Sequence, residues 1–134
     1  WAAISICKNG VAVNTIGKTI ENYIKPYGYG IVRDFCGHGI GKKMHEDPEV
    51  PAFFDKNNKV ILQTGMCITI EPMINRGECR VRVMGDGWTA KTIDGSRSAQ
   101  WEHTLYINDD GCEVLSFNSV DLAAKKSPII ILNK

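Results

Sequence analysis

Apolar residues follow two kinds of pattern, helical at the start of the chain and alternating beyond it. Between residues 15 and 27 they recur at helical spacing and Gly28 follows, so we predict a helix there. Residues 2–8 predict the end of another helix, which Asn9 and Gly10 stop. From residue 29 onward the pattern is that of strands.

Strands are predicted where apolar and polar side chains alternate over short runs bounded by turn residues. A Pro-, Asp- and Asn-rich stretch, residues 45–58, predicts a connecting loop instead. Two helices ahead of several antiparallel strands predict an α+β fold, in which helices cover one face of an antiparallel sheet. The predicted strands are residues 29–35, 60–62, 66–74, 100–108 and 112–117, with a strand–loop–strand unit over residues 80–95.

Two of these strands have one apolar and one polar face, and each polar face is centred on a glutamate. On the first, Cys67, Thr69 and Glu71 share a face because successive side chains of a strand alternate. On the second, the face of Glu102 otherwise holds uncharged polar side chains. Neither polar face contains Lys or Arg, which a solvated face would normally carry.

The two glutamates have alternative interpretations. They are either solvated side chains of a half-exposed structural sheet, or parts of a site. Pro72 removes a hydrogen-bond donor directly after Glu71, which predicts a sheet edge, a bulge or the mouth of a cleft at that point. If both polar faces turn toward one cavity, their carboxylates need a cation or a shared proton, and a metal ion fits better.

The histidines divide between packing and chemistry. His103 lies on an apolar face beside Trp101, so we interpret it as a packed structural residue. His38 lies between two glycines in the segment CGHGIGKKMHEDP, and His45 follows in the same segment. One imidazole and two carboxylates form a ligand set suited to divalent Mn, Fe, Co or Zn.

Composition limits the class of protein. The 134 residues suffice for one domain, 43% of them are hydrophobic, and the net charge is +1. There is no basic stripe with interleaved aromatics, which argues against a nucleic-acid partner, and the longest apolar run, residues 128–132, is too short to span a membrane. Five cysteines without a CxxC pair favour free thiols in a reducing compartment, so we expect a cytoplasmic protein.

The first residues, WAAISICKNG, read as though they were cut from the middle of a helix. We therefore expect this chain to be a fragment. A segment that targets an organelle would lie in the missing part, and that alternative stays open.

Four short motifs in a fixed order resemble one enzyme family. GHGIG, with His45 seven residues after His38, is followed by TIEPM, DGWTA and SAQWEHT. This order resembles the C-terminal half of a type I methionine aminopeptidase over residues 2–116, because type II enzymes carry a helical insertion after His45. Prolidase and aminopeptidase P are related alternatives, but Met73 and the SAQ triplet favour methionine aminopeptidase.

The resemblance implies a pita-bread fold and an activity. Residues 1–117 would form the C-terminal half of the catalytic domain, and residues 118–134 a tail. The implied reaction removes the N-terminal methionine from peptides or nascent proteins, which also makes the ribosome an expected partner. The family also includes non-catalytic peptide-binding modules, which typically lose ligand residues.

The resemblance further implies the roles of individual residues. His38, Glu71 and Glu102 would be metal ligands, with Glu102 bridging two divalent ions of Co, Mn, Fe or Zn. Glu71 would also act as the catalytic general base and then acid, and His45 would bind the scissile amide.

The remaining implied residues contact the substrate. Cys36 and Trp88 would line the pocket for the methionine side chain, since a thioether packs well against sulfur and aromatic groups. Met44 stands where relatives often have phenylalanine, and Gln100, the last residue of the SAQ triplet, precedes the last glutamate, Glu102. His45 also belongs to the residues that the resemblance implies contact the substrate.

One departure from the family pattern limits the expected activity. The family takes two aspartate ligands and another histidine from its N-terminal half, and Asp34 is the only aspartate ahead of GHGIG, in the wrong context. We therefore expect this chain alone to show reduced or no metal occupancy and no turnover. We also expect an exposed apolar patch, through which it dimerises or pairs with its N-terminal half.

Overall fold

A helical layer forms the first fifth of the chain in the computed structural model, which describes residues 1–119, 121 and 129–131. The 3₁₀ helix η1 (Ile4–Ile6) precedes helix α1 (Val13–Ile24), which continues into a second 3₁₀ turn, η2 (Lys25–Tyr27). Gly28 ends this helix in the left-handed conformation with φ 65°. The predicted helix over residues 15–27 is thus confirmed, and the predicted helix end over residues 2–8 is a short 3₁₀ turn. None of the helices in the described part of the chain is long and apolar enough to cross a membrane.

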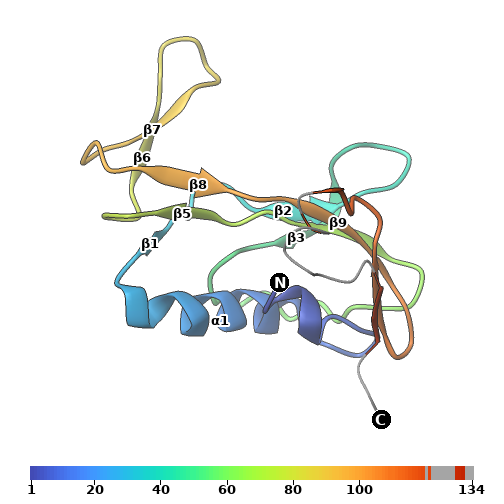
Figure 1. Ribbon diagram of the computed structural model, residues 1–134. Coiled ribbons are helices and arrows are strands. Elements are labelled where there is room, and N and C mark those ends of the chain that lie inside the picture. Colours follow the sequence, from blue (N-terminus) through green and yellow to red (C-terminus); the bar gives the residue numbers. More distant parts are fainter. Residues whose placement is uncertain (120, 122–128, 132–134) are drawn as a thin grey trace.

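Strands follow the helices and, within the described residues, form three antiparallel sheets (Figure 1). The six-stranded sheet has the order β11-β10-β9-β4-β2-β3, with β11 (Ile129–Ile131), β10 (Gly111–Val114), β9 (His103–Ile107), β4 (Cys67–Ile70), β2 (Gly37–Gly39) and β3 (Glu46–Val50). The three-stranded sheet has the order β1-β5-β8, with β1 (Gly30–Ile31), β5 (Met73–Asn75) and β8 (Ser98–Gln100). A separate hairpin consists of β6 (Val81–Val83) and β7 (Ala90–Thr92).

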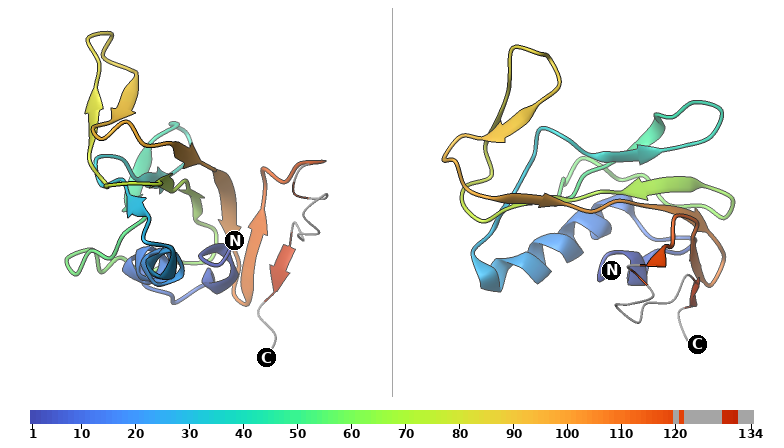
Figure 2. Two further views of the ribbon diagram at one scale, coloured as in Figure 1. Left: turned by 60° about the vertical axis from the view of Figure 1, so that its left-hand side comes forward. Right: turned by 45° about the horizontal axis from the view of Figure 1, so that its top comes forward.

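The core lies between the helices and one face of the six-stranded sheet. Figures 1 and 2 show α1 and η1 on the same side of the sheet, and the β6–β7 hairpin projecting away from the body. Ile16 and Ile20 of α1 face the sheet, and β4 and β9 contribute their apolar sides. The predicted arrangement, in which helices cover one face of an antiparallel sheet, is therefore confirmed. The buried apolar residues of this cluster are Ala3, Ile4, Cys7, Val13, Ile16, Ile20, Val50, Ala52, Leu62, Ile68, Ile70, Leu105, Ile107, Cys112 and Val114.

The two predicted glutamate strands are each broken at the glutamate. β4 belongs to the six-stranded sheet and β5 to the three-stranded sheet, and Glu71 lies between them. In the same way, Glu102 lies between β8 and β9. The register of Ile70 with His103 continues across the break to Met73 with Gln100, which sets the two glutamates opposite each other.

The predicted loop over residues 45–58 is wrong in its first part. Residues 46–50 form β3, which pairs with β2, and only Pro48 and Val50 are buried. Proline lacks a backbone donor, but β3 is the outer strand of its sheet within the described residues, where proline is tolerated. Residues 60–62 also form no strand and contribute one bridge, between Ala12 and Ile61.

The other strand predictions differ from the structure mainly in length. Residues 29–35 contain the two-residue strand β1, and residues 112–117 contain most of β10. The predicted tail, residues 118–134, lies largely outside the described residues. Within it, β11 extends the sheet beside β10, and the buried Asp121 contacts β9.

Candidate metal centre

The structure brings the three predicted metal ligands together. His38 comes from β2, and the two glutamates come from the breaks that separate the six-stranded from the three-stranded sheet. One ligand atom each of His38, Glu71 and Glu102 lie within 4.8 Å of one another. His38 Nε2 is 3.4 Å from Glu71 Oε1; both side chains are largely buried, whereas Glu102 is exposed.

The orientation of His38 suits a metal ligand. Its Nδ1 lies 2.9 Å from the carbonyl oxygen of Gly39, so a proton on Nδ1 is donated to the backbone. This leaves the lone pair of Nε2 directed toward Glu71. Histidines that bind metals typically donate their second ring N–H to a carbonyl or carboxylate in this way.

Thr69 connects His38 and Glu71, and the sequence assigned it no role. Its hydroxyl donates to Glu71 Oε1 at 2.9 Å and accepts the backbone N–H of His38, also at 2.9 Å. Thr69 is fully buried, so these partners are fixed. Its position on the polar face, two residues before Glu71, was the only signal that the sequence held.

Glycines on both sides of His38 are required by neighbouring backbone. A Cβ atom on Gly37 would lie 2.3 Å from the carbonyl oxygen of Thr69, and one on Gly39 would lie 2.0 Å from that of Asp47. β2 therefore fits between β3 and β4 only because it has hydrogen atoms at those positions. The glycines position the imidazole by letting the three strands approach closely.

The pKa of the Glu71 carboxyl is raised above its ordinary value. Burial raises the pKa of Glu71, the hydrogen bond from Thr69 opposes that rise, and the charge of Glu102 adds to it. Two opposed carboxylates beside an imidazole lone pair form a donor set that a divalent cation fits. A bound cation would reverse the rise in the pKa of Glu71 because it stabilises the ionised carboxylate.

His45 lies next to the cluster. Its ring centroid is 4.3 Å from that of His38, and the two planes are inclined by 59°. His45 is exposed, at the end of the loop that leads into β3. It is therefore close enough to contact a group bound beside His38, as its predicted role requires.

The predicted substrate residues are not gathered in one place. Cys36 is half-buried beside β2, and burial followed by the charge of Glu49 raises the pKa of its thiol. Met44 is 70% exposed and Gln100 is exposed on β8. Trp88 is 89% exposed in the projecting hairpin, so the described residues form no methionine pocket around it. Their roles in substrate binding stay predictions.

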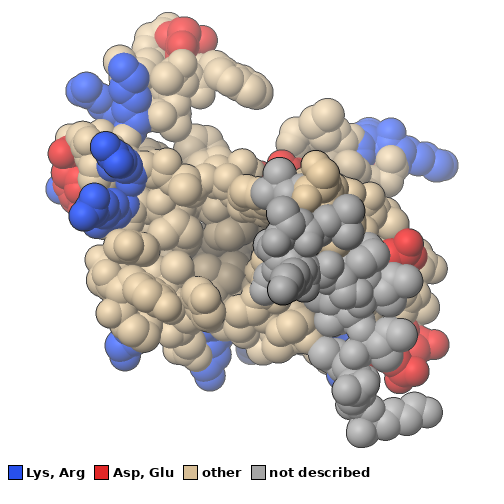
Figure 3. Space-filling model, in the orientation of Figure 1, with Lys and Arg blue, Asp and Glu red and all other residues tan. Residues whose placement is uncertain are grey.

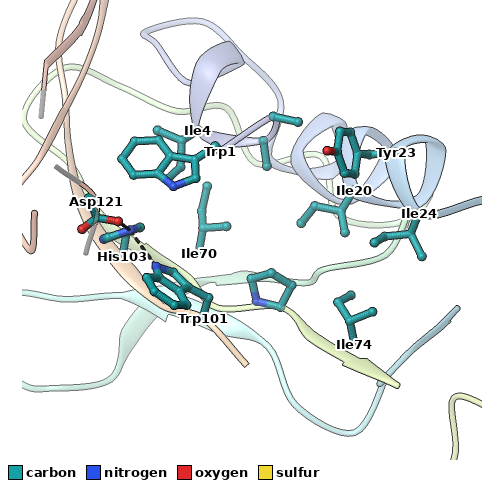
Figure 4. Close-up of a pocket in the computed structure, with 13 residues that line it drawn as sticks. Trp1, Ile4, Ile20, Tyr23, Ile24, Ile70, Ile74, Trp101, His103 and Asp121 are labelled. Carbon is teal, nitrogen blue, oxygen red and sulfur yellow. Dashed lines mark hydrogen bonds and ion pairs between the residues drawn. The ribbon is translucent and has the colours of Figure 1, made fainter. Parts of the chain in front are cut away.

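His103 has the structural role that its apolar face predicted. It is buried, accepts the indole N–H of Trp101 at Nε2 (3.0 Å), and lies 3.0 Å from the hydroxyl of Ser116 through Nδ1. Asp121 Oδ1 is 3.3 Å from its Nε2 (Figure 4). Nothing in the sequence pattern indicated Asp121, because it comes from the predicted tail.

Comparisons with known proteins agree with this geometry. Residues 1–109 match Metallopeptidase family M24. A methionine aminopeptidase of Salmonella typhimurium is 46% identical over 121 residues, which are 90% of this chain and 46% of that protein. The chain therefore spans about half the length of the curated relatives it matches.

Solved structures show the same relationship. A methionine aminopeptidase from Thermotoga maritima aligns with a TM-score of 0.82 at 40% identity, covering 87% of this chain and 47% of that chain. One from Rickettsia prowazekii aligns with a TM-score of 0.83 at 37% identity and the same coverage. These alignments confirm the predicted α+β pita-bread fold. With its ligand cluster at the junction of two sheets, the chain belongs to metallopeptidase family M24, whose members use divalent metal ions.

Proposed function

We propose that this chain is the C-terminal half of a methionine aminopeptidase, which removes the N-terminal methionine of peptides and nascent proteins. The observation that carries the proposal is the cluster of His38, Glu71 and Glu102 at the junction of two sheets. The names and identities of the relatives support this substrate.

The residues fit a metal centre. His38 Nε2 and the carboxylates of Glu71 and Glu102 would hold the metal, since Glu71 and Glu102 lie opposite each other in the strand register. The role of Glu102 as a ligand of both ions is what the resemblance to the family implies. Co, Mn, Fe and Zn all accept this donor set. When bound, divalent ions supply Lewis-acid polarisation and lower the pKa of water to near neutrality.

Glu71 would then transfer a proton, and His45 would donate a hydrogen bond to the substrate. Oε1 of Glu71 already accepts from Thr69, so Oε2 is the atom free to take a proton from the attacking water. Glu71 would return that proton to the leaving amine. His45, beside His38, would donate a hydrogen bond to the scissile carbonyl oxygen as negative charge develops on it.

Three ligands are too few to hold two divalent ions well. We propose that the N-terminal half, with the two aspartates that the resemblance implies, completes the site. The 134-residue chain alone would show weak metal occupancy and no turnover. We further propose a cytoplasmic location, in keeping with five free cysteines, and action on chains that leave the ribosome.

The test compares this chain with the complete protein, meaning this chain together with the N-terminal half that its relatives carry. Both are assayed for release of methionine from a Met-Ala peptide with added Mn or Co. We expect metal-dependent release by the complete protein, loss of release and of metal content in Glu102→Ala, and no release by the chain alone.

Other outcomes would contradict the proposal in different ways. Robust turnover by the chain alone would overturn the argument from missing ligands. Cleavage of Xaa-Pro peptides without methionine release would assign the protein to a prolidase-like activity. Peptide binding without cleavage or metal would assign it to the non-catalytic modules.

A further inference from the structure

Glu49 lies on the same face of the sheet as the metal ligands. β2 and β3 are antiparallel, and His38 pairs directly with Glu49. Directly opposite residues of such a pair project from the same face. The neighbours Pro48 and Val50 are buried on the other face, whereas Glu49 is exposed. Glu49 therefore lies beside the cluster and, like His45, is outside the proposed ligand set.

The position of Glu49 is fixed by its backbone, and its charge is unpaired. β2 pairs with it on one side, and the side-chain amide of Asn58 donates to its carbonyl oxygen at 2.9 Å. Its carboxylate forms no ion pair with any residue in the described ranges.

Glu49 lies on the strand next to the one that carries His38, so a peptide bound at His38 lies close to it. β3 is the outer strand of the six-stranded sheet within the described residues. A protein substrate whose scissile bond lies at His38 continues for many residues, and Glu46, Asp47 and Glu49 of this outer strand are exposed. The basic residues of the same β-hairpin, Lys42 and Lys43, lie at its tip, beyond the end of the pairing that contains Glu49.

We propose that Glu49 forms a subsite for a positively charged residue of the peptide, a few positions after the N-terminal methionine. This inference rests on the proposed function and adds a substrate class to it: chains whose first residues are cationic. The interaction is between exposed charges, so it selects among substrates without being required for cleavage.

The test uses the metal-loaded complete protein and peptides of the form Met-Ala-Xaa-Gly, with Xaa as Lys, Gln or Glu; a second series moves Xaa to the fourth position. We expect kcat/KM for Lys to exceed that for Glu by about two- to fivefold in at least one series at low salt. The preference should shrink in about 0.5 M salt because the charges are screened. Glu49→Gln should remove it, and Glu49→Lys should reverse it.

A matched control removes the same charge elsewhere on the same face. Glu113 is exposed on β10, which β9 and β4 separate from β2, and Glu113→Gln should keep the preference for Lys. An equal kcat/KM for all peptides in the unaltered protein, or an unchanged preference in Glu49→Gln, would overturn the inference and leave the proposed function intact. Failure of every variant to release methionine would instead contradict the proposed function.

Discussion

A single hydroxyl group, that of Thr69, connects two of the three proposed metal ligands. It holds the carboxylate of Glu71 through Oε1 and the backbone of His38 through its N–H. Groups that orient metal ligands in this way commonly contribute substantially to metal affinity. A change at Thr69 therefore tests how much the orientation of Glu71 and His38 contributes to metal binding, because Thr69 itself is not a proposed ligand.

We predict that Thr69→Val lowers the affinity of the complete protein for Mn by about 10- to 100-fold. Valine has nearly the same shape but leaves Glu71 Oε1 and the N–H of His38 without their partner. The measurement is isothermal titration with the metal. Thr69→Ser keeps the hydroxyl and should bind nearly normally.

Thr104 supplies a matched control for this change. It pairs with Thr69 on the adjacent strand and on the same face. Thr104→Val should leave Mn affinity unchanged. Equal losses of affinity in the two valine variants would show that the polar face as a whole, and not the Thr69 hydroxyl, supports the ligands.

Residue-level prediction from the sequence succeeded where geometry is local. Alternation along a strand sufficed to assign Glu71 to a polar face and His103 to an apolar one, because side-chain direction depends only on the backbone period. The partners of those residues were not predictable. Thr69 and Asp121 act through contacts that only the strand register and the path of the tail create.

At the scale of elements, the close packing of β2 is the feature that shapes the centre. β3 and β4 flank β2 on its two sides, and the backbones of these neighbours occupy the space where side chains of Gly37 and Gly39 would project. The strand carries the histidine ligand, so any widening of the sheet would move it away from the glutamates.

We predict that Gly37→Ala destabilises the chain by about 1–3 kcal/mol, the usual range for overpacking. The added Cβ would meet the carbonyl oxygen of Thr69, which belongs to a strand and cannot give way easily. Urea unfolding measures the change. Gly85→Ala is the control, since a Cβ there meets nothing within 4 Å. Equal stability of the two variants would contradict the close approach.

The elements that sequence patterns missed have a common physical cause. β3 was predicted as part of a loop because residues 45–58 are rich in Pro, Asp and Asn, yet a strand that pairs on one side tolerates proline. The strands over residues 66–74 and 100–108 were predicted as continuous, since the period of two runs through both breaks. Their division between two sheets depends on pairing partners, β2 for β4 and β1 for β5, which no local pattern contains.

At the scale of the molecule, an open groove lies on the helical side of the sheet. It has a volume of about 690 Å³ and lies between α1 and η1 on one side and β4, β5 and β9 on the other. In the face that Figure 3 shows, charged side chains lie mainly around the periphery and the visible surface near the central hollow is mostly uncharged. Most residues that line the groove are apolar, and the buried Asp121 is also among them. Trp101, at 49% exposure, and Tyr23, at 60%, line the same groove (Figure 4).

This groove fits the expectation of an exposed apolar patch. Exposed apolar side chains gathered in a groove are typical of a surface that binds a partner. The relatives are about twice as long as this chain, so the cover that we infer is the N-terminal half. In its absence, a second copy of the chain is the available substitute.

We predict that the chain alone self-associates as its concentration rises, whereas the complete protein does not. Sedimentation velocity over a range of concentrations measures this. Tyr23→Glu should weaken the association, because it places a charge at the rim of the groove on an exposed position of α1 that the core does not use. Val83→Glu adds the same charge on the projecting hairpin, at a residue that is 52% exposed, and should have no effect. A chain that stays monomeric at every concentration would contradict the predicted self-association. Equal weakening by the two variants would show that the association does not occur through this groove.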